Sequence, residues 1–118
     1  VLKNNKPYLV VGTPGGTTIP TSVFQSIVNV IDFGMSAEDA VNKPKFHHQW
    51  LPDLIFTEKD FDEATITALE AMGYKINKRG NIGRTEMIQV LGKKIIAVGD
   101  KRGDDAAEGY WFFYSTNF

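Results

Sequence analysis

The sequence predicts an α+β fold for residues 1–118, with helices set against mostly antiparallel strands. Three patterns predict this class: short β-favouring runs bounded by Gly and Pro, apolar residues at helical spacing, and two β-favouring runs around a two-residue turn. A chain of 118 residues has room for one hydrophobic core, so we expect a single domain.

The first half of the chain predicts a strand, a tight loop and two helices. A β-favouring run at 8–11 stops at the Gly and Pro residues of 12–16, and apolar residues then recur at steps of three and four from 19 to 33. Ser36 followed by Asp39 predicts the capped start of a short helix that Pro44 ends. We expect 45–53 to be an irregular, ordered connector before a strand at 54–56.

The second half predicts one more helix and a β-hairpin. Asp60 followed by Glu63 predicts the helix start, Gly73 closes the helix, and a strand at 74–76 follows. The runs 87–91 and 95–98 flank a Gly-Lys turn and predict two antiparallel strands. The aromatic run 110–114 fits either a last strand or a docking tail.

Composition excludes several classes of function. Thirteen basic and fourteen acidic side chains give a formal net charge of -1, which makes nucleic acid and anionic membranes improbable partners. No apolar run is long enough to span a bilayer, and the absence of Cys excludes disulfides and thiolate chemistry. The first residue is Val and no leader pattern stands at the front, so we expect a chain processed or excised from a longer one.

The Gly15-Gly16 pair after the first strand is the main candidate for chemistry. Residues without a Cβ let backbone N–H groups approach a ligand closely, and two such groups can stabilise a developing oxyanion. The pair by itself is more typical of a structural turn. A phosphate-binding loop is disfavoured because Thr17 and Thr18 follow the glycines in place of a Lys-Ser/Thr pair.

Other polar clusters carry weaker signals. His47 and His48 are adjacent and point apart in regular structure, so they are poorly placed to share a metal, and a hydrogen-bonded structural role is favoured. The acidic residues Asp100, Asp104 and Asp105 lack calcium-loop spacing and are typical of a solvated turn. A further group of basic residues predicts an ordinary solvated face: Lys75, Lys78, Arg79 and Arg84.

Several blocks of the sequence, in order, resemble the small subunit of gamma-glutamyltransferases. They are 8–16 (YLVVGTPGG), 40–53 (AVNKPKFHHQWLPD), 69–76 (LEAMGYKI), 99–102 (GDKR) and 106–110 (AAEGY). The second block is the most specific and carries Lys45 where Arg is usual. Lys101 stands where Pro is common, and Trp111 to Phe118 extend beyond the family's usual end.

The resemblance implies the N-terminal-nucleophile hydrolase fold, with two packed sheets between helical layers, and cleavage or transfer of the gamma-glutamyl group of glutathione and related amides. Gly15 and Gly16 fall on the family's oxyanion-hole glycines. The nucleophilic threonine, freed by autoprocessing of a precursor, has no counterpart here, because the first threonine is Thr13, inside the loop. We therefore expect an inactive fragment, needing neither a cofactor nor a metal.

The resemblance also implies partners and a compartment. The expected partners are the rest of the precursor, meaning the large subunit and the N-terminal part of the small subunit, and a gamma-glutamyl substrate. Uncovered sheet edges and apolar faces predict self-association of the fragment. Whole enzymes of this family work outside the cytoplasm, so the resemblance implies that the full-length protein is periplasmic or secreted. The alternative hypothesis is a non-catalytic interaction or assembly module of the same fold.

Overall fold

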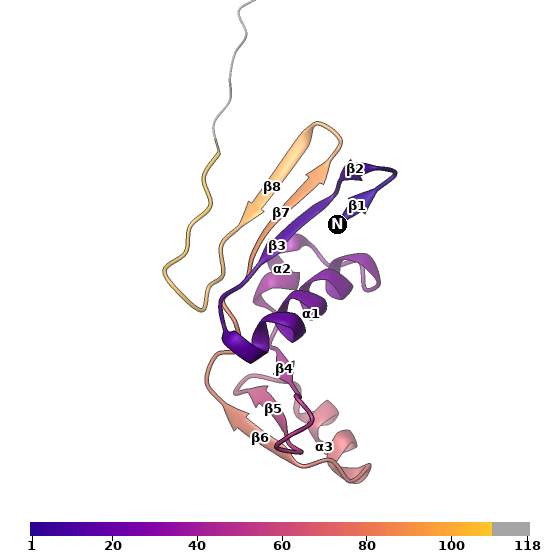
Figure 1. The fold of residues 1–118 in the computed structure, drawn as a ribbon, viewed down its shortest axis with the longest axis vertical. Coiled ribbons are helices and arrows are strands. Elements are labelled where there is room, and N and C mark those ends of the chain that lie inside the picture. The colour runs from indigo at the N-terminus through magenta and orange to yellow at the C-terminus, as the bar shows by residue number, and fades with distance from the viewer. Residues whose placement is uncertain (110–118) are drawn as a thin grey trace, which may run out of the picture.

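The computed structural model describes residues 1–109 and builds them around two small sheets (Figure 1). Strands β3 (Leu9–Gly12), β7 (Glu86–Leu91) and β8 (Lys94–Val98) form an antiparallel sheet in the order β3-β7-β8. Strands β4 (Phe46–His47), β5 (Ile55–Glu58) and β6 (Ile76–Arg79) form the second sheet. A small hairpin, β1 (Leu2–Lys3) and β2 (Lys6–Pro7), precedes them. The predicted α+β class is confirmed, while the 110–114 run lies outside the described residues.

Two helices cover one face of the first sheet. Helix α1 (Ile19–Ile31) has Pro in its first turn, and α2 (Ala37–Asn42) begins where the Ser36 hydroxyl accepts a hydrogen bond from the Asp39 amide at 3.1 Å, as its sequence predicts. Burial of apolar surface between helices and sheet forms the main core. The buried core residues are Leu9, Val30, Ala37, Ala40, Val41 and Met87.

The opposite face of this sheet is apolar and exposed. Side chains alternate along a strand, so Met87 and Gln89 of β7 point toward the helices and Ile88 points away. Ile88 pairs in register with Val10 on β3 and Ala97 on β8. Val10 is 58% exposed and Ile88 is 41% exposed. Within residues 1–109 the sheet therefore carries a helix layer on one side and an exposed apolar surface on the other.

The second sheet contains a parallel pair joined through a helix. Strand β5 runs parallel to β6, and α3 (Glu63–Ala71) lies in the crossover between them. The helix is capped by Asp62, whose carboxylate accepts from the Thr65 amide at 2.7 Å. The prediction that Asp60 caps this helix is wrong because residues 58–61 form a turn, closed by the Phe61 amide donating to the Glu58 carbonyl at 3.2 Å.

Two further differences concern strand boundaries. The predicted strand at 74–76 begins at Ile76, because the Tyr74 amide still donates to the Leu69 carbonyl at the end of α3. The predicted irregular connector contains the short strand β4, which pairs with β5. A two-residue strand has no periodicity of its own, so only its pairing with β5 makes it a strand. Within residues 1–109 no helix has the length and apolar character to cross a membrane.

A buried ion cluster joins the two sheets. Glu58, at the end of β5, accepts hydrogen bonds from the Ile82 amide at 2.7 Å, the Lys45 amide at 2.7 Å and the Arg102 guanidinium at 2.6 Å. Arg102 also donates to Asp100 at 3.1 Å, and Asp100 accepts from the Thr85 amide at 2.6 Å. The prediction that Asp100 lies in a solvated turn is wrong, because its side chain is fully buried against these partners.

Burial and hydrogen bonding move two pKa values in this cluster. Burial alone would raise the pKa of the Glu58 carboxyl, but hydrogen bonds from Arg102 and from the Ile82 and Lys45 amides outweigh it and lower the pKa. The Lys45 ammonium is buried and donates to the Val41 carbonyl at 2.6 Å. Burial, with repulsion from Arg102, lowers the pKa of Lys45 to about 8.

We predict that Glu58→Gln lowers the free energy of unfolding by about 3 kcal/mol at neutral pH, because Arg102 and two amides lose a charged acceptor in a buried site. The lowered pKa of Glu58 means that its contribution is present above the ordinary Glu range and is lost as pH falls through the lowered value. The unfolding free energies of the wild type and Glu58→Gln, measured with urea, should therefore converge as the pH is lowered. The control is Glu70→Gln on the exposed surface of α3. An equal effect of the two substitutions would contradict the role given to Glu58.

We predict that Lys45 makes stability depend on pH in the alkaline range. Because its pKa is about 8 when folded and its ordinary value is 10.5, the unfavourable burial of the charge at neutral pH is relieved as pH rises between those values. The unfolding free energy of the wild-type chain should thus rise by about 3 kcal/mol relative to Lys45→Met between pH ~7 and ~10. The exposed Lys59→Met is the matched control. Parallel pH curves for wild type and Lys45→Met would disprove the shift.

Candidate functional site

The glycine loop, residues Thr13–Gly16, connects β3 to α1 and has a backbone that requires glycine. Gly15 has φ +143° and Gly16 has φ +59°, in the region that L side chains rarely adopt. Gly16 opens a short 3-10 turn (Gly16–Thr18) that leads into α1. The turn is closed by the amide and hydroxyl of Thr18, which donate to the Gly15 carbonyl at 3.2 and 2.9 Å. The structural turn that the Gly15-Gly16 pair by itself predicts is thus present.

The two glycine amides remain available to an external acceptor. Both residues are exposed. Among the hydrogen bonds of residues 1–109, none is donated by the amide of Gly15 or Gly16 to another part of the chain. A backbone N–H is a strong donor that normally finds a partner, so two exposed amides in one tight turn can hold an anionic oxygen.

Thr13 fixes the loop to a distant segment. Its hydroxyl donates to the Pro14 carbonyl at 2.8 Å and accepts from the Arg84 amide at 2.8 Å. The Arg84 guanidinium in turn pairs with Asp105 and with Asp104, the latter at 2.6 Å. The sequence-based prediction of a solvated turn is therefore wrong for Asp105, whose side chain is 13% exposed, whereas Arg84 remains 42% exposed. The pair of Arg84 and Asp105 holds the last described segment against the loop.

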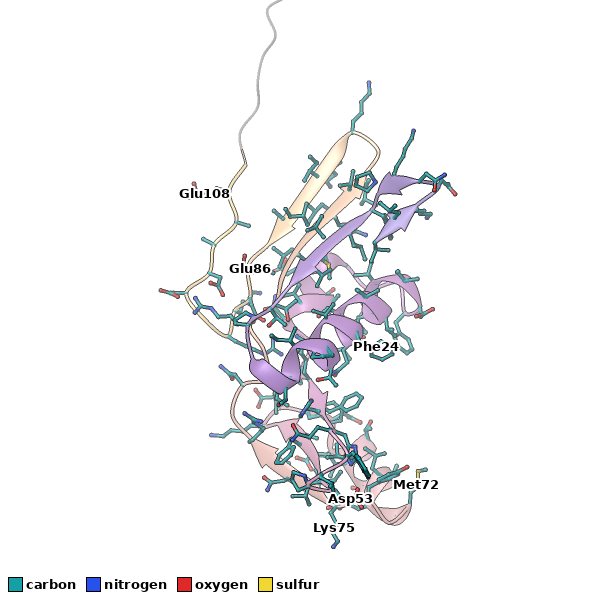
Figure 2. All side chains as sticks on the ribbon, in the orientation of Figure 1. Phe24, Asp53, Met72, Lys75, Glu86 and Glu108 are labelled. Atoms are coloured by element: carbon teal, nitrogen blue, oxygen red, sulfur yellow. The ribbon has the colours of Figure 1, made fainter. Side chains whose placement is uncertain are left out.

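A groove of about 780 Å³ begins at the loop and runs along the uncovered face of the first sheet. Thr13 and Pro14 line its end at the loop, while Gly15 and Gly16 are outside its lining. Its apolar lining includes Val10, Ile88 and Ala97, and its charged lining includes Arg84, Glu86 and Glu108. Figure 2 shows Glu86 at the start of β7 and Glu108 on the chain segment that follows β8. The groove suits an extended, partly apolar segment rather than a compact anion.

The two histidines have structural hydrogen bonds, as predicted. His47 is buried, with Nδ1 at 2.8 Å from the Thr21 hydroxyl and Nε2 at 2.9 Å from the Gln49 side-chain oxygen. His48 lies at the surface, with Nε2 at 3.2 Å from Asp53. Within residues 1–109 no group of three or more His, Asp and Glu side chains is arranged to hold a metal ion.

Sequence reasoning missed the residues that support the glycine loop. Arg84 and Thr13 are 71 positions apart, and Gly83, beside Arg84, packs behind the loop against Ser22 of α1. The only local signal was the glycine-rich turn at 80–83. Spacing along the chain cannot show which distant segment such a turn will touch.

Comparison with known proteins gives one consistent result. A family model described as gamma-glutamyltranspeptidase matches residues 1–110. The glutathione hydrolase proenzyme of Escherichia coli (strain K12) is 43% identical over 112 residues, which cover 93% of this chain. The corresponding proenzyme of Pseudomonas aeruginosa is 42% identical over 107 residues. The chain spans 19% of the length of each of these relatives.

Solved structures agree with the sequence comparisons. A mutant of Helicobacter pylori gamma-glutamyltranspeptidase superposes with a TM-score of 0.84 at 44% identity, covering 87% of this chain and 58% of that one. Gamma-glutamyltranspeptidase from Pseudomonas nitroreducens superposes with a TM-score of 0.87 at 36% identity, covering 94% and 60%. The expected N-terminal-nucleophile hydrolase architecture is therefore confirmed at the level of fold class.

Proposed function

Because this chain belongs to the gamma-glutamyltranspeptidase family, we propose that it is the C-terminal part of the small subunit of an enzyme that cleaves or transfers the gamma-glutamyl group of glutathione and related amides. Two relatives that it matches over most of its length are named glutathione hydrolase proenzymes. The activity belongs to the whole protein, and this chain contributes one part of its active site.

The contribution that we propose is the oxyanion hole. In acyl transfer a nucleophile attacks the amide carbonyl, and the carbonyl oxygen gains negative charge in the tetrahedral intermediate. The amides of Gly15 and Gly16 would donate hydrogen bonds to that oxygen. The observation that carries this assignment is the pair of exposed amides in a left-handed turn with no acceptor among residues 1–109. Loss of one such donor typically slows turnover by about 10²–10³-fold.

The nucleophile would come from another part of the precursor. Thr13 is poorly suited to the role, because its hydroxyl donates to the Pro14 carbonyl and accepts from the Arg84 amide, and no general base among residues 1–109 is hydrogen-bonded to it. The 118-residue chain alone would therefore be inactive, and no cofactor or metal is needed for the proposed chemistry. A periplasmic or secreted parent is proposed on resemblance to the family alone.

The uncovered face of the first sheet fits the remainder of the precursor as a partner. A sheet with helices on one face and exposed Val10, Ile88 and Ile95 away from them is half of a layered sandwich. A second sheet supplied by the rest of the protein would bury this face. The ion cluster that joins the two sheets of the present chain supports treating residues 1–118 as one domain within that assembly.

We predict that Gly16→Asn in the full-length precursor lowers kcat on a chromogenic gamma-glutamyl amide by about a hundredfold. Asn tolerates a left-handed backbone, and a Cβ atom at Gly16 would have no atom within 4 Å beyond its chain neighbours. The fold should therefore persist while the approach to the amides is obstructed. Steady-state kinetics on the processed enzyme measure the effect.

Gly92→Asn is the matched control, because Gly92 has φ +63° and open surroundings in the hairpin between β7 and β8. It should keep kcat within about twofold. Normal turnover of Gly16→Asn would exclude the oxyanion assignment and favour the interaction module as the role of this chain.

We also predict that the isolated 118-residue chain self-associates at tens of micromolar, because the sheet exposes contiguous apolar side chains. The double substitution Val10→Thr, Ile88→Thr keeps β-branched residues at both positions and should shift the molecular mass toward monomer. Light scattering on both proteins tests this. A wild-type chain that stays monomeric at those concentrations would show that the face does not recruit a second copy.

A further inference from the structure

Gly83 packs directly behind the glycine loop in a space that admits no side chain. Its φ is +71°, and a Cβ atom there would lie 2.7 Å from the Ser22 hydroxyl, 3.0 Å from the Thr13 hydroxyl and 3.1 Å from the Ser22 Cβ. Contacts this short require the neighbours to move. Gly83 is therefore glycine for two independent reasons, its left-handed backbone and the lack of space.

The same residue supports Gly15. A Cβ built on Gly15 would lie 3.7 Å from the Gly83 Cα, so the two glycine backbones face each other at close range. Ser22, in α1, is fully buried, and its hydroxyl has no hydrogen-bond partner among residues 1–109. Ser22 fits here because it is small, and a larger side chain would clash with Gly83.

The segment that carries Gly83 is held firmly on both sides. The Ile82 amide donates to Glu58 at 2.7 Å and the Thr85 amide donates to Asp100 at 2.6 Å, both to buried carboxylates. Between them, the Arg84 amide donates to the Thr13 hydroxyl at 2.8 Å. Residues 82–85 thus form a rigid support that touches the loop through Gly83 and Arg84.

We propose that Gly83 is a positioning residue for the Gly15 and Gly16 amides, acting through its contacts with Ser22 and Thr13. This inference rests on the proposed oxyanion function of the loop. The Ser22 hydroxyl can rotate away from a methyl group at Gly83, but the contacts with the Thr13 hydroxyl at 3.0 Å and the Ser22 Cβ at 3.1 Å still require the loop or α1 to shift. An error of ~1 Å in the placement of a catalytic group can cost about a hundredfold in rate, and smaller errors cost less. Gly83 itself touches no substrate.

The test is Gly83→Ala in the full-length precursor, compared with Gly92→Ala. Both positions have a left-handed backbone, at φ +71° and +63°, so both variants carry backbone strain, but only Gly83 lacks space for a methyl group. Gly83→Ala should lower kcat by about ten- to a hundredfold per processed molecule while KM stays within about threefold. Gly92→Ala should keep kcat within about twofold.

A rescue experiment separates positioning from general loss of stability. Ser22→Gly removes both Ser22 atoms that the new methyl group would strike, so the double variant Gly83→Ala, Ser22→Gly should recover at least about threefold of the lost kcat. Glycine within α1 destabilises the helix, so a defect caused by low stability would become worse in the double variant. Failure of the double variant to recover kcat would overturn the proposal.

A second pair of variants decides the matter if Gly83→Ala does not fold. Thr13→Val removes the acceptor for the Arg84 amide, whereas Thr13→Ser keeps it. Thr13→Val should show a kcat at least about tenfold below that of Thr13→Ser. Equal values would overturn the proposal. If Gly16→Asn lowers kcat and Gly83→Ala does not, only the positioning role fails; if both retain kcat, the oxyanion function itself fails.

Discussion

The Glu58 carboxylate is the contact on which the rest of this structure depends. It receives hydrogen bonds from the Lys45 amide just before β4, the Ile82 amide after β6 and the Arg102 guanidinium near the end of the described chain. A carboxylate withdrawn from water is unfavourable unless its oxygens are fully paired, so the fold must bring all three donors together. That requirement links the two sheets, since Glu58 ends β5 of one sheet and Arg102 follows β8 of the other.

The ion cluster and the glycine loop are connected by a continuous set of contacts. Glu58 and Asp100 fix the amides on either side of Gly83, and Gly83 with Arg84 supports the loop through backbone contact and the Thr13 hydroxyl. A surface loop is ordinarily the least rigid part of a domain. Here a buried charge pair and a crowded glycine hold it, and the oxyanion role that we propose for the loop would require such preorganisation.

The layered arrangement explains why an apolar sheet face is left open. Helices α1 and α2 lie against the sheet (Figure 1). Leu9 and Met87 are buried on that side, and the other side presents Val10 and Ile88 to solvent along the groove. A two-sheet sandwich buries such a face against a second sheet. The chain spans 19% of the length of its curated relatives, so the proposed partner for this face is another part of a longer protein.

The sequence by itself determined the local elements and the family. The β7–β8 hairpin, α1, the Ser36 cap of α2 and the need for glycine at Gly15 and Gly16 follow from spacing and backbone preference within a few residues. The blocks that resemble gamma-glutamyltransferases identified the family. Only the tertiary structure decided the burial of Asp100, the strand at Phe46–His47 and the support of the loop by Gly83. These depend on partners such as Arg102 with Glu58, 44 positions apart, or Thr13 with Arg84, 71 apart. The local sequence pattern predicts the backbone conformation that a residue prefers. The energy of a buried charge or of a crowded glycine depends instead on which distant segment packs against it.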